Sequence, residues 1–238
     1  MATVTAADTD GYVRRNVTGG PTWASVRDAS SGNQAKSSIT RYTTAVMVQG
    51  GSSRGGFYYV YRSFFAFDTS GIDFPPSAAT LKIYGYGYNN ADVIAVRATA
   101  PDLSTNLVTG NYNAIDGFVG GASMSGNATD YSSEITTWST SGYNDITLTN
   151  DALIDMAAND ILKIALVEYD YDYLNVDPGG STAARTGLYY EDYSGTGTDP
   201  YIDYTPSTIS QVNDVAAASI SQFNDVAVSS IKNISGVD

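Results

Sequence analysis

The run GGFYYVYRSFFAFDTS at residues 55–70 limits the fold of this chain more than any other segment. Aromatic and β-branched side chains occupy both alternating faces of the run, and these residue types favour strands. The segment is also too short and too branched for a stable helix. It therefore predicts a long apolar strand.

Similar segments, bounded by Gly, Pro, Asn or Asp, recur through the first 206 residues and predict an all-β fold. One helix is expected in TNDALIDMAAN, where Thr149 or Asn150 can cap a turn that carries Leu153, Ile154 and Met156. These elements predict an antiparallel β-sandwich with one short helix. The expected strands are 3–7, 11–17, 22–27, 42–49, 57–67, 79–87, 92–98, 144–149, 161–169, 185–193 and 199–204.

Charge and composition exclude several classes of function. The chain has 12 basic and 25 acidic residues, a net charge of −13, so it repels a phosphate backbone and we expect no nucleic-acid partner. It contains no Cys and no His, which excludes thiol nucleophiles, the usual zinc sites, Ser-His-Asp triads and disulfides. Catalysis would have to use carboxylates, Tyr or Lys. No motif for such chemistry is present, and we expect no enzymatic activity and no cofactor other than calcium.

The N-terminal segment MATVTAADTDGYVRRNV lacks the basic start and the continuous apolar run of a secretory signal. No other segment approaches the length of a membrane span. We therefore expect a protein that is made in the cytoplasm and does not insert into a membrane.

A change of composition at Pro206 divides the chain into a body, residues 1–206, and a tail, residues 207–238. All 19 Tyr and all 7 Pro lie in the body. The order of TVTAADTDGYVRR, YRSFFAFDTSGIDFPPSAATLKIYGYG and DPYIDYTP resembles that of the DNRLRE domains and their relatives among carbohydrate-binding modules. The resemblance implies a jelly-roll fold for the body but no particular activity. The residues that match the family pattern are Arg62, Phe67, Asp68, Pro75, Ala79, Leu81 and Ile83.

Arg62 lies within the apolar run, where an unpaired guanidinium would be costly to bury. We expect it to pair with a carboxylate or with strand carbonyls, as an internal contact of the body and not as a ligand contact.

The segment YGYGYNNAD places Tyr84, Tyr86 and Tyr88 on one face of a strand and Gly85 and Gly87 on the other. Two interpretations are open. The phenol rings can stack on sugar rings as a glycan-binding surface. Alternatively they pack on an adjoining sheet, and the glycines admit a close neighbour.

The segment EYDYDYLNVDPGG contains the densest group of oxygen ligands, Asp170, Asp172 and Asp177. If the strand continues through it, Glu168, Asp170 and Asp172 share one face. Such carboxylates are either solvated at an edge or joined by a hard cation such as calcium. The spacing does not match an EF-hand.

The tail repeats an eleven-residue unit, ISQVNDVAAAS followed by ISQFNDVAVSS, and begins it again as IKNISGVD. Apolar residues at fixed offsets and Asn-Asp or Ser-Gly pairs predict a short strand, a two-residue turn and a second short strand in each unit. Such units bury too little to be stable alone, so they are expected to make assembly contacts. The apolar positions are Ile209, Val212, Val215, Ile220, Phe223, Val226, Ile231, Ile234 and Val237.

The tail resembles those of structural proteins of tailed bacteriophages. The resemblance implies a virion surface protein, such as a capsid-decorating, head-fibre or tail-fibre protein, that assembles as a homo-oligomer or with other virion proteins. The alternative is a carbohydrate-binding module or adhesin that recognises cell-surface glycans.

Overall fold

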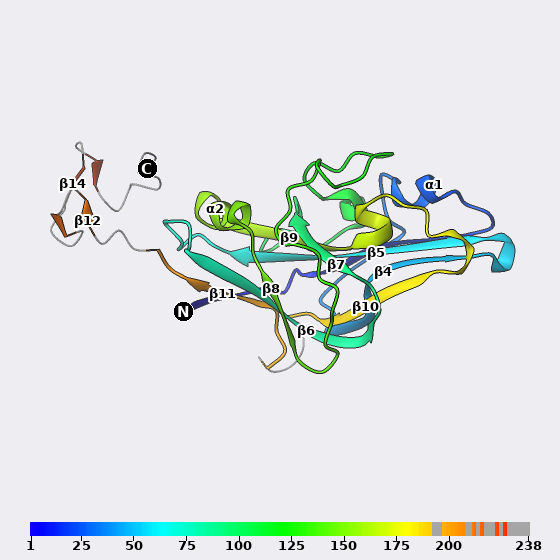
Figure 1. Cartoon of the computed structure of the whole chain (residues 1–238), viewed down its shortest axis with the longest axis horizontal. Helices are drawn as coiled ribbons and strands as arrows, with labels where there is room; N and C mark the ends of the chain where they lie inside the picture. Colours follow the sequence, from blue (N-terminus) through cyan, green and yellow to red (C-terminus); the bar gives the residue numbers. More distant parts are fainter. Residues whose placement is uncertain (192–196, 208–210, 213–214, 217–221, 224–225, 228–238) are drawn as a thin grey trace.

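The computed structural model describes residues 1–191, 197–207, 211–212, 215–216, 222–223 and 226–227. These residues form mostly antiparallel β-sheet with few helices, which confirms the all-β class (Figure 1). The α-helices are α1 (Trp23–Arg27) and α2 (Asn150–Ala158). The strands of the body are β1 (Ala2–Thr5), β2 (Gly11–Thr18), β3 (Gln34–Ser37), β4 (Arg41–Gly51), β5 (Phe57–Asp68), β6 (Ala78–Asn89), β7 (Val93–Arg97), β8 (Tyr143–Thr147), β9 (Ile161–Glu168), β10 (Ala183–Tyr189) and β11 (Tyr201–Thr205).

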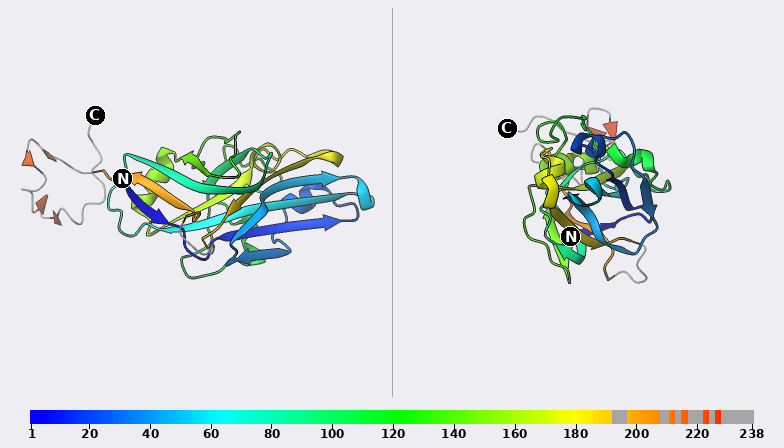
Figure 2. Two further views of the ribbon diagram at one scale, coloured as in Figure 1. Left: turned by 90° about the horizontal axis from the view of Figure 1, so that it is seen from below. Right: turned by 90° about the vertical axis from the view of Figure 1, so that its right-hand side faces the viewer.

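The body strands belong to one branched sheet of eleven strands, in the order β1-β11-β6-β10-β4-β5-β2-β3, with β8 paired to β6 and β9 paired to β5 and β7. The branch lies in β5, because Tyr61 pairs with Met47 of β4 whereas Ser63 pairs with Leu166 of β9. The opposite edge of β5 stays paired with β2 across this change. The strands run along the length of the body (Figure 2).

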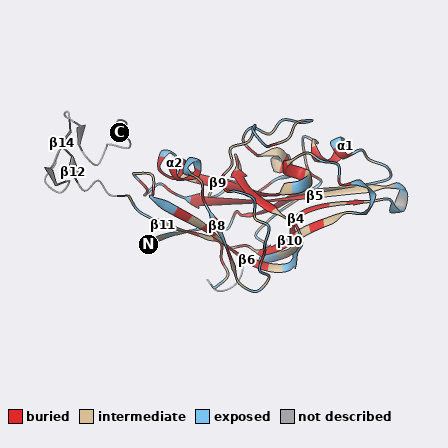
Figure 3. Cartoon of the chain, in the orientation of Figure 1, coloured by how far each residue is buried: buried red, intermediate tan, exposed pale blue. Residues whose placement is uncertain are grey.

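Two hydrophobic clusters lie on opposite faces of β5, β9 and β7. Phe65 and Phe67 of β5 belong to the first cluster, which also contains residues of β6, β8, β10 and β11, so these two groups of strands pack face to face. Phe64 belongs to the second cluster, where α1 and the long connection between β7 and β8 cover the sheet. Figure 3 shows the resulting burial along β5, β7 and β9. Double-sided burial explains why the run 57–68 is apolar on both faces.

One predicted strand was wrong, and one strand of the structure was missed. The segment 22–27 is helix α1 and not a strand, because the Thr22 side chain accepts a hydrogen bond from the Ser25 amide (3.2 Å) and caps a helical turn. Strand β3 was not predicted, since its sequence, QAKS, is polar and lies at the edge of the sheet. Each of the other predicted strands overlaps a strand of the structure.

The predicted helix is confirmed as α2, with Thr149 at its N-cap position. The Thr149 hydroxyl does not cap the helix but donates to the Asp130 carbonyl (2.8 Å). Leu153 and Met156 are buried, whereas Ile154 is 46% exposed. Within the described residues no helix has the length and the apolar character that crossing a membrane requires.

The described parts of the tail form two separate strand pairs, β12 (Gln211–Val212) with β13 (Val215–Ala216) and β14 (Gln222–Phe223) with β15 (Val226–Ala227). These pairs occupy equivalent positions in the first two repeats. Of the predicted assembly residues, Ile209, Ile220, Ile231, Ile234 and Val237 lie outside the described residues. The division of the chain at residue 206 stays a prediction.

Candidate functional site

Five tyrosine rings form a continuous series of contacts on the outer face of β6, β8, β10 and β11, which we call the tyrosine surface. Neighbouring rings are edge to face, the geometry that aromatic quadrupoles favour. Because Leu81, Ile83 and Gly85 of β6 face the core, the alternating Tyr84 and Tyr86 face outward and are half-buried. The centroid distances are 5.3 Å for Tyr86–Tyr189, 5.5 Å for Tyr189–Tyr84, 5.2 Å for Tyr84–Tyr143 and 5.2 Å for Tyr143–Tyr201.

Two arginines lie over rings of β6, Arg41 over Tyr86 of the tyrosine surface and Arg185 over Tyr88. The Arg41 guanidinium carbon is 4.4 Å from the Tyr86 centroid, and its Nη1 donates to the Tyr189 hydroxyl (2.7 Å). The Arg185 guanidinium carbon is 3.8 Å from the centroid of Tyr88, whose side chain is 44% exposed. Stacked guanidinium groups take up part of the ring faces and place hydrogen-bond donors beside them.

In the structure Tyr84 and Tyr86 face outward on β6, and Tyr88 is exposed beyond Gly87, whose φ is +78°. A Cβ atom at Gly85 would lie 1.7 Å from the Ser139 carbonyl oxygen, so this glycine does admit a close neighbour. The rings of Tyr84 and Tyr86 are not covered by an adjoining sheet, because both side chains stay partly exposed. Glycan binding by them stays a prediction.

The predicted alternation after Glu168 was wrong. Strand β9 ends at Glu168, and residues Tyr169–Tyr173 form a π-helical turn. The buried Glu168 carboxylate accepts hydrogen bonds from the amides of Asp170 (3.2 Å), Tyr171 (2.8 Å) and Asp172 (3.1 Å). These bonds draw the backbone into a turn, so Glu168, Asp170 and Asp172 do not share the face of a strand.

The three predicted calcium ligands do not converge. Asp172 is fully buried and pairs with Arg62. Asp177 accepts hydrogen bonds from the Tyr58 hydroxyl and the Gly179 amide, both at 2.8 Å. Only Asp170 stays at the surface beside other acidic side chains.

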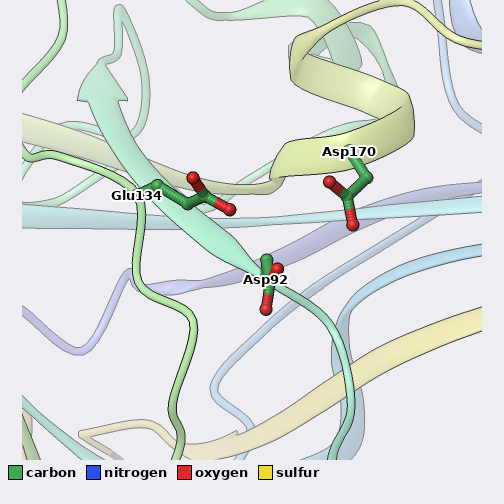
Figure 4. Close-up of side chains that lie close together, drawn as sticks. All are labelled: Asp92, Glu134 and Asp170. Carbon is green, nitrogen blue, oxygen red and sulfur yellow. The ribbon is translucent and has the colours of Figure 1, made fainter.

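Asp170 belongs instead to an acidic cluster with Asp92 and Glu134 (Figure 4). One carboxylate oxygen of each residue lies within 4.8 Å of the others. Burial first, and the neighbouring carboxylates second, raise the pKa of Glu134, and burial and Asp92 raise the pKa of Asp170. Carboxylate oxygens are the ligands that calcium prefers, and calcium binding stays a prediction.

Sequence reasoning missed Asp92 and Glu134 because only strand pairing brings them to Asp170. Val93 pairs with Glu168 of β9 and forms an isolated bridge with Ile135. Asp92 and Glu134 directly precede Val93 and Ile135, and Asp170 follows Glu168 by two residues, so the three carboxylates meet at one point. No local spacing signal relates segments so far apart in the sequence.

The prediction for Arg62 is confirmed. Its Nε and Nη2 donate to the two carboxylate oxygens of Asp172, each at 2.7 Å. Nη1 donates to the Tyr112 carbonyl (2.8 Å) and to the Asn113 side chain (2.6 Å), and the guanidinium lies over the Tyr112 ring. Arg62 and Asp172 are both fully buried. The pair joins β5 to the π-helical turn and has no access to a ligand.

A polar hollow of about 370 Å³ lies beside α2 and is lined by Arg97, Tyr131, Asp155, Asn159 and Lys163, among others. The Tyr131 hydroxyl and the Arg97 guanidinium both donate to Asp155. Burial and the hydrogen bond to Asp155 raise the pKa of Tyr131 well above its usual value. Arg97, Tyr131 and Asp155 thus form one hydrogen-bonded network in the wall of this hollow.

No protein-family model matches the sequence, and a search of curated proteins finds no relative.

Proposed function

We propose that the protein is a non-enzymatic structural protein of the virion surface of a tailed bacteriophage, as a capsid-decorating, head-fibre or tail-fibre protein. In this proposal the body, a jelly-roll domain of the DNRLRE or carbohydrate-binding-module kind, faces outward. The tail mediates assembly with copies of the chain or with other virion proteins. The observation that carries the proposal is the repeat of the tail, which places the strand pair β12–β13 again, eleven residues later, as β14–β15.

The size of the tail strands supports an assembly role. Each strand in these pairs has two residues. An isolated two-stranded hairpin is at best marginally stable in water, and three or more strands or a packing partner are normally required. A segment that repeats such pairs gains stability when another chain supplies the missing apolar contacts.

The test compares the mass in solution of the full chain with that of residues 1–206 by light scattering. We expect a defined oligomer for the full chain and a monomer for the fragment. Phe223→Asp places a charge at an apolar offset of the repeat and should abolish the oligomer. Ser230→Asp adds the same charge at an offset that is Ser in both complete units and should leave the oligomer intact. Monomers in all four samples would contradict self-assembly by the tail.

The virion role has its own test, which is incorporation into particles. The full chain should be recovered with purified virions, and residues 1–206 should be lost from them. Equal recovery of the two would contradict attachment through the tail.

A second candidate function, recognition of host-surface glycans, is favoured by the tyrosine surface and by the two arginines stacked on rings of β6. Phenol rings and neighbouring donors are the groups that bind the apolar faces and the oxygens of sugars. A glycan array probed with the full chain tests it. Selective binding should be lost in Tyr86→Ala and Tyr88→Ala and retained in Tyr88→Phe, which keeps the ring. Binding that survives both alanine substitutions would contradict this role for Tyr86 and Tyr88.

A further inference from the structure

A hollow of about 340 Å³ lies on the outer face of the sheet at the β1–β11 pair, lined by Thr3, Thr5, Asp199, Tyr201 and Asp203. The strand register explains this composition, because Thr5 lies opposite Tyr201 and Thr3 lies opposite Asp203. Cross-strand partners share one face of a sheet, so these four side chains form a block. Thr3 and Thr5 are exposed, and β1 is the last strand in the order of the sheet, so the block is accessible.

Asp199 is the unusual member of this group. It is 6% exposed, and its Oδ1 atom is buried without a hydrogen-bond partner among the described residues. The hydroxyl of the preceding Thr198 is also buried and has no partner within the part of the chain that the structure describes. Buried polar atoms are almost always hydrogen-bonded, and an unpaired one costs free energy. Because Asp199 lines the hollow, its carboxyl group brings to that wall acceptor capacity that the described residues leave unused.

Tyr201 supplies a fixed aromatic surface between two carboxylates. The Tyr143 ring contacts it edge to face at 5.2 Å, and the Tyr143 hydroxyl donates to the Asp199 carbonyl (3.1 Å). Asp199, Tyr201 and Asp203 alternate along one face of the chain. The hollow therefore presents one ring flanked by hydrogen-bond acceptors, with two hydroxyls from β1 opposite.

We propose that this hollow binds one or two residues of a neutral or amino sugar. The apolar face of the sugar stacks on Tyr201, and its hydroxyl or ammonium groups donate to Asp199 and Asp203. The volume lies within the range of small-molecule sites, about 300–1,000 Å³. The inference rests on the second function proposed above, glycan recognition, and adds to it a sugar subsite at the Tyr201 end of the tyrosine surface, opposite the Tyr86 end.

The chemistry of the lining excludes the other simple ligands. Two carboxylates in a chain of net charge −13 repel acidic sugars and phosphates. In the described residues the one group of three or more side chains positioned to hold a metal is Asp92, Glu134 and Asp170, so Asp199 and Asp203 form no such group. A polyhydroxylated, uncharged or cationic ligand matches a site that is rich in acceptors.

The test uses the full chain and saturation-transfer difference NMR, with methyl glycosides of glucose, galactose, mannose and glucosamine as probes and methyl glucuronide as the acidic comparison. At least one neutral or amino probe should bind. Tyr201→Ala should weaken this binding about ten-fold, as loss of one stacking contact implies, and Tyr201→Phe should retain it.

Tyr201→Ala could lose binding because it fails to fold, so a second pair of variants changes exposed residues instead. Thr5→Arg fills the hollow from an exposed position and should also abolish binding, whereas Thr147→Arg, at an exposed position of β8 on the same sheet, should not. Binding of the glucuronide alone, or binding unchanged in Thr5→Arg, would overturn the proposed site. Loss of binding in Tyr88→Ala but not in Tyr201→Ala would place glycan recognition at Tyr88 and not at the hollow. Absence of binding by every probe, with a glycan array that is also negative, would overturn both.

Discussion

At the scale of single residues, the buried carboxylates decide how the body is held together. The Asp172 carboxylate accepts hydrogen bonds from Nε and Nη2 of Arg62. The backbone carbonyl of Asp172 accepts one from Arg27 Nε (2.9 Å). Removing one partner of such a pair leaves a buried charge unpaired, which costs about 3–5 kcal/mol. We therefore expect Asp172→Asn to lower the free energy of unfolding in urea by about that amount.

The control for this prediction makes the same chemical change at the surface. Asp145 pairs with Lys82 at 2.6 Å, but its side chain is 61% exposed. Exposed pairs contribute about 0–1 kcal/mol, so Asp145→Asn should be nearly neutral. Arg62→Met combined with Asp172→Leu should recover part of the loss, because the charge of Arg62 is removed as well and Arg27, which also lies beside Asp172, keeps its ion pair with Asp28 (2.7 Å). Equal costs for the two Asn variants would show that burial of the ion pair has no role.

Glu168 predicts a pH dependence. Burial raises the pKa of its carboxyl to about 8, although hydrogen bonds from the Tyr171 and Asp172 amides act in the opposite direction. The folded state therefore holds the proton more tightly than the unfolded state, whose pKa is near 4.5. It follows that the contribution of Glu168 to stability falls as pH rises from about 4.5 to about 8.

In the variant Glu168→Gln the side chain at position 168 cannot titrate, so the pH-dependent part of stability that Glu168 provides should be absent. Its unfolding free energy, measured in urea, should rise relative to that of the unmodified protein between pH 5 and pH 8. Other carboxyls with raised pKa values, such as Asp130, act equally in both proteins and cancel in the comparison. Parallel pH profiles for the two proteins would contradict the assignment.

At the scale of elements, the sequence predicted a strand correctly where the pattern of apolar residues matches the faces that are buried in the fold. Strand β5 is apolar on both faces because both of its faces are buried, so its composition predicts it directly. The period-two alternation of Tyr169–Tyr173 was misleading, because the Glu168 carboxylate binds the following amides and a turn results. Helix α1 lies where a strand was predicted, because the Thr22 side chain caps a helical turn there. The acidic cluster depends on strand register, which local sequence does not specify.

Gly85 gives a prediction at the same scale. An added Cβ would meet the Ser139 carbonyl at 1.7 Å, so Gly85→Ala forces the backbone of the segment before β8 away from β6. We expect a loss of about 1–3 kcal/mol or more, measured by thermal unfolding. Gly71→Ala is the matched control, because no atom lies within 4 Å of its added Cβ. Its effect should be small and stabilising. A neutral Gly85→Ala would mean that the two segments do not approach so closely.

At the scale of the whole molecule, the two hydrophobic clusters share one layer of strands. Val93 and Ala95 of β7 face the first cluster, and Ile94 and Val96 face the second. The long connection between β7 and β8 is therefore part of the folded body, since it provides Leu107, Tyr112 and Met124 to the second cluster. This explains how a chain with few charges and many turn residues buries a large core without disulfides.

The last prediction concerns the boundary at residue 206. The final core contacts come from β11, where Ile202 is fully buried and Tyr204 packs against the first cluster. Strand β11 is also held between β1 and β6, so the body closes on itself before the tail begins. Residues 1–206 should therefore unfold in urea in one transition, with the midpoint of the full chain. The slope of the unfolding free energy against urea concentration should also be the same for the fragment and the full chain, because this slope scales with the surface that unfolding exposes. A shallower transition or a lower midpoint for the fragment would show that the tail contributes to the core, and the chain would then have to be treated as one unit.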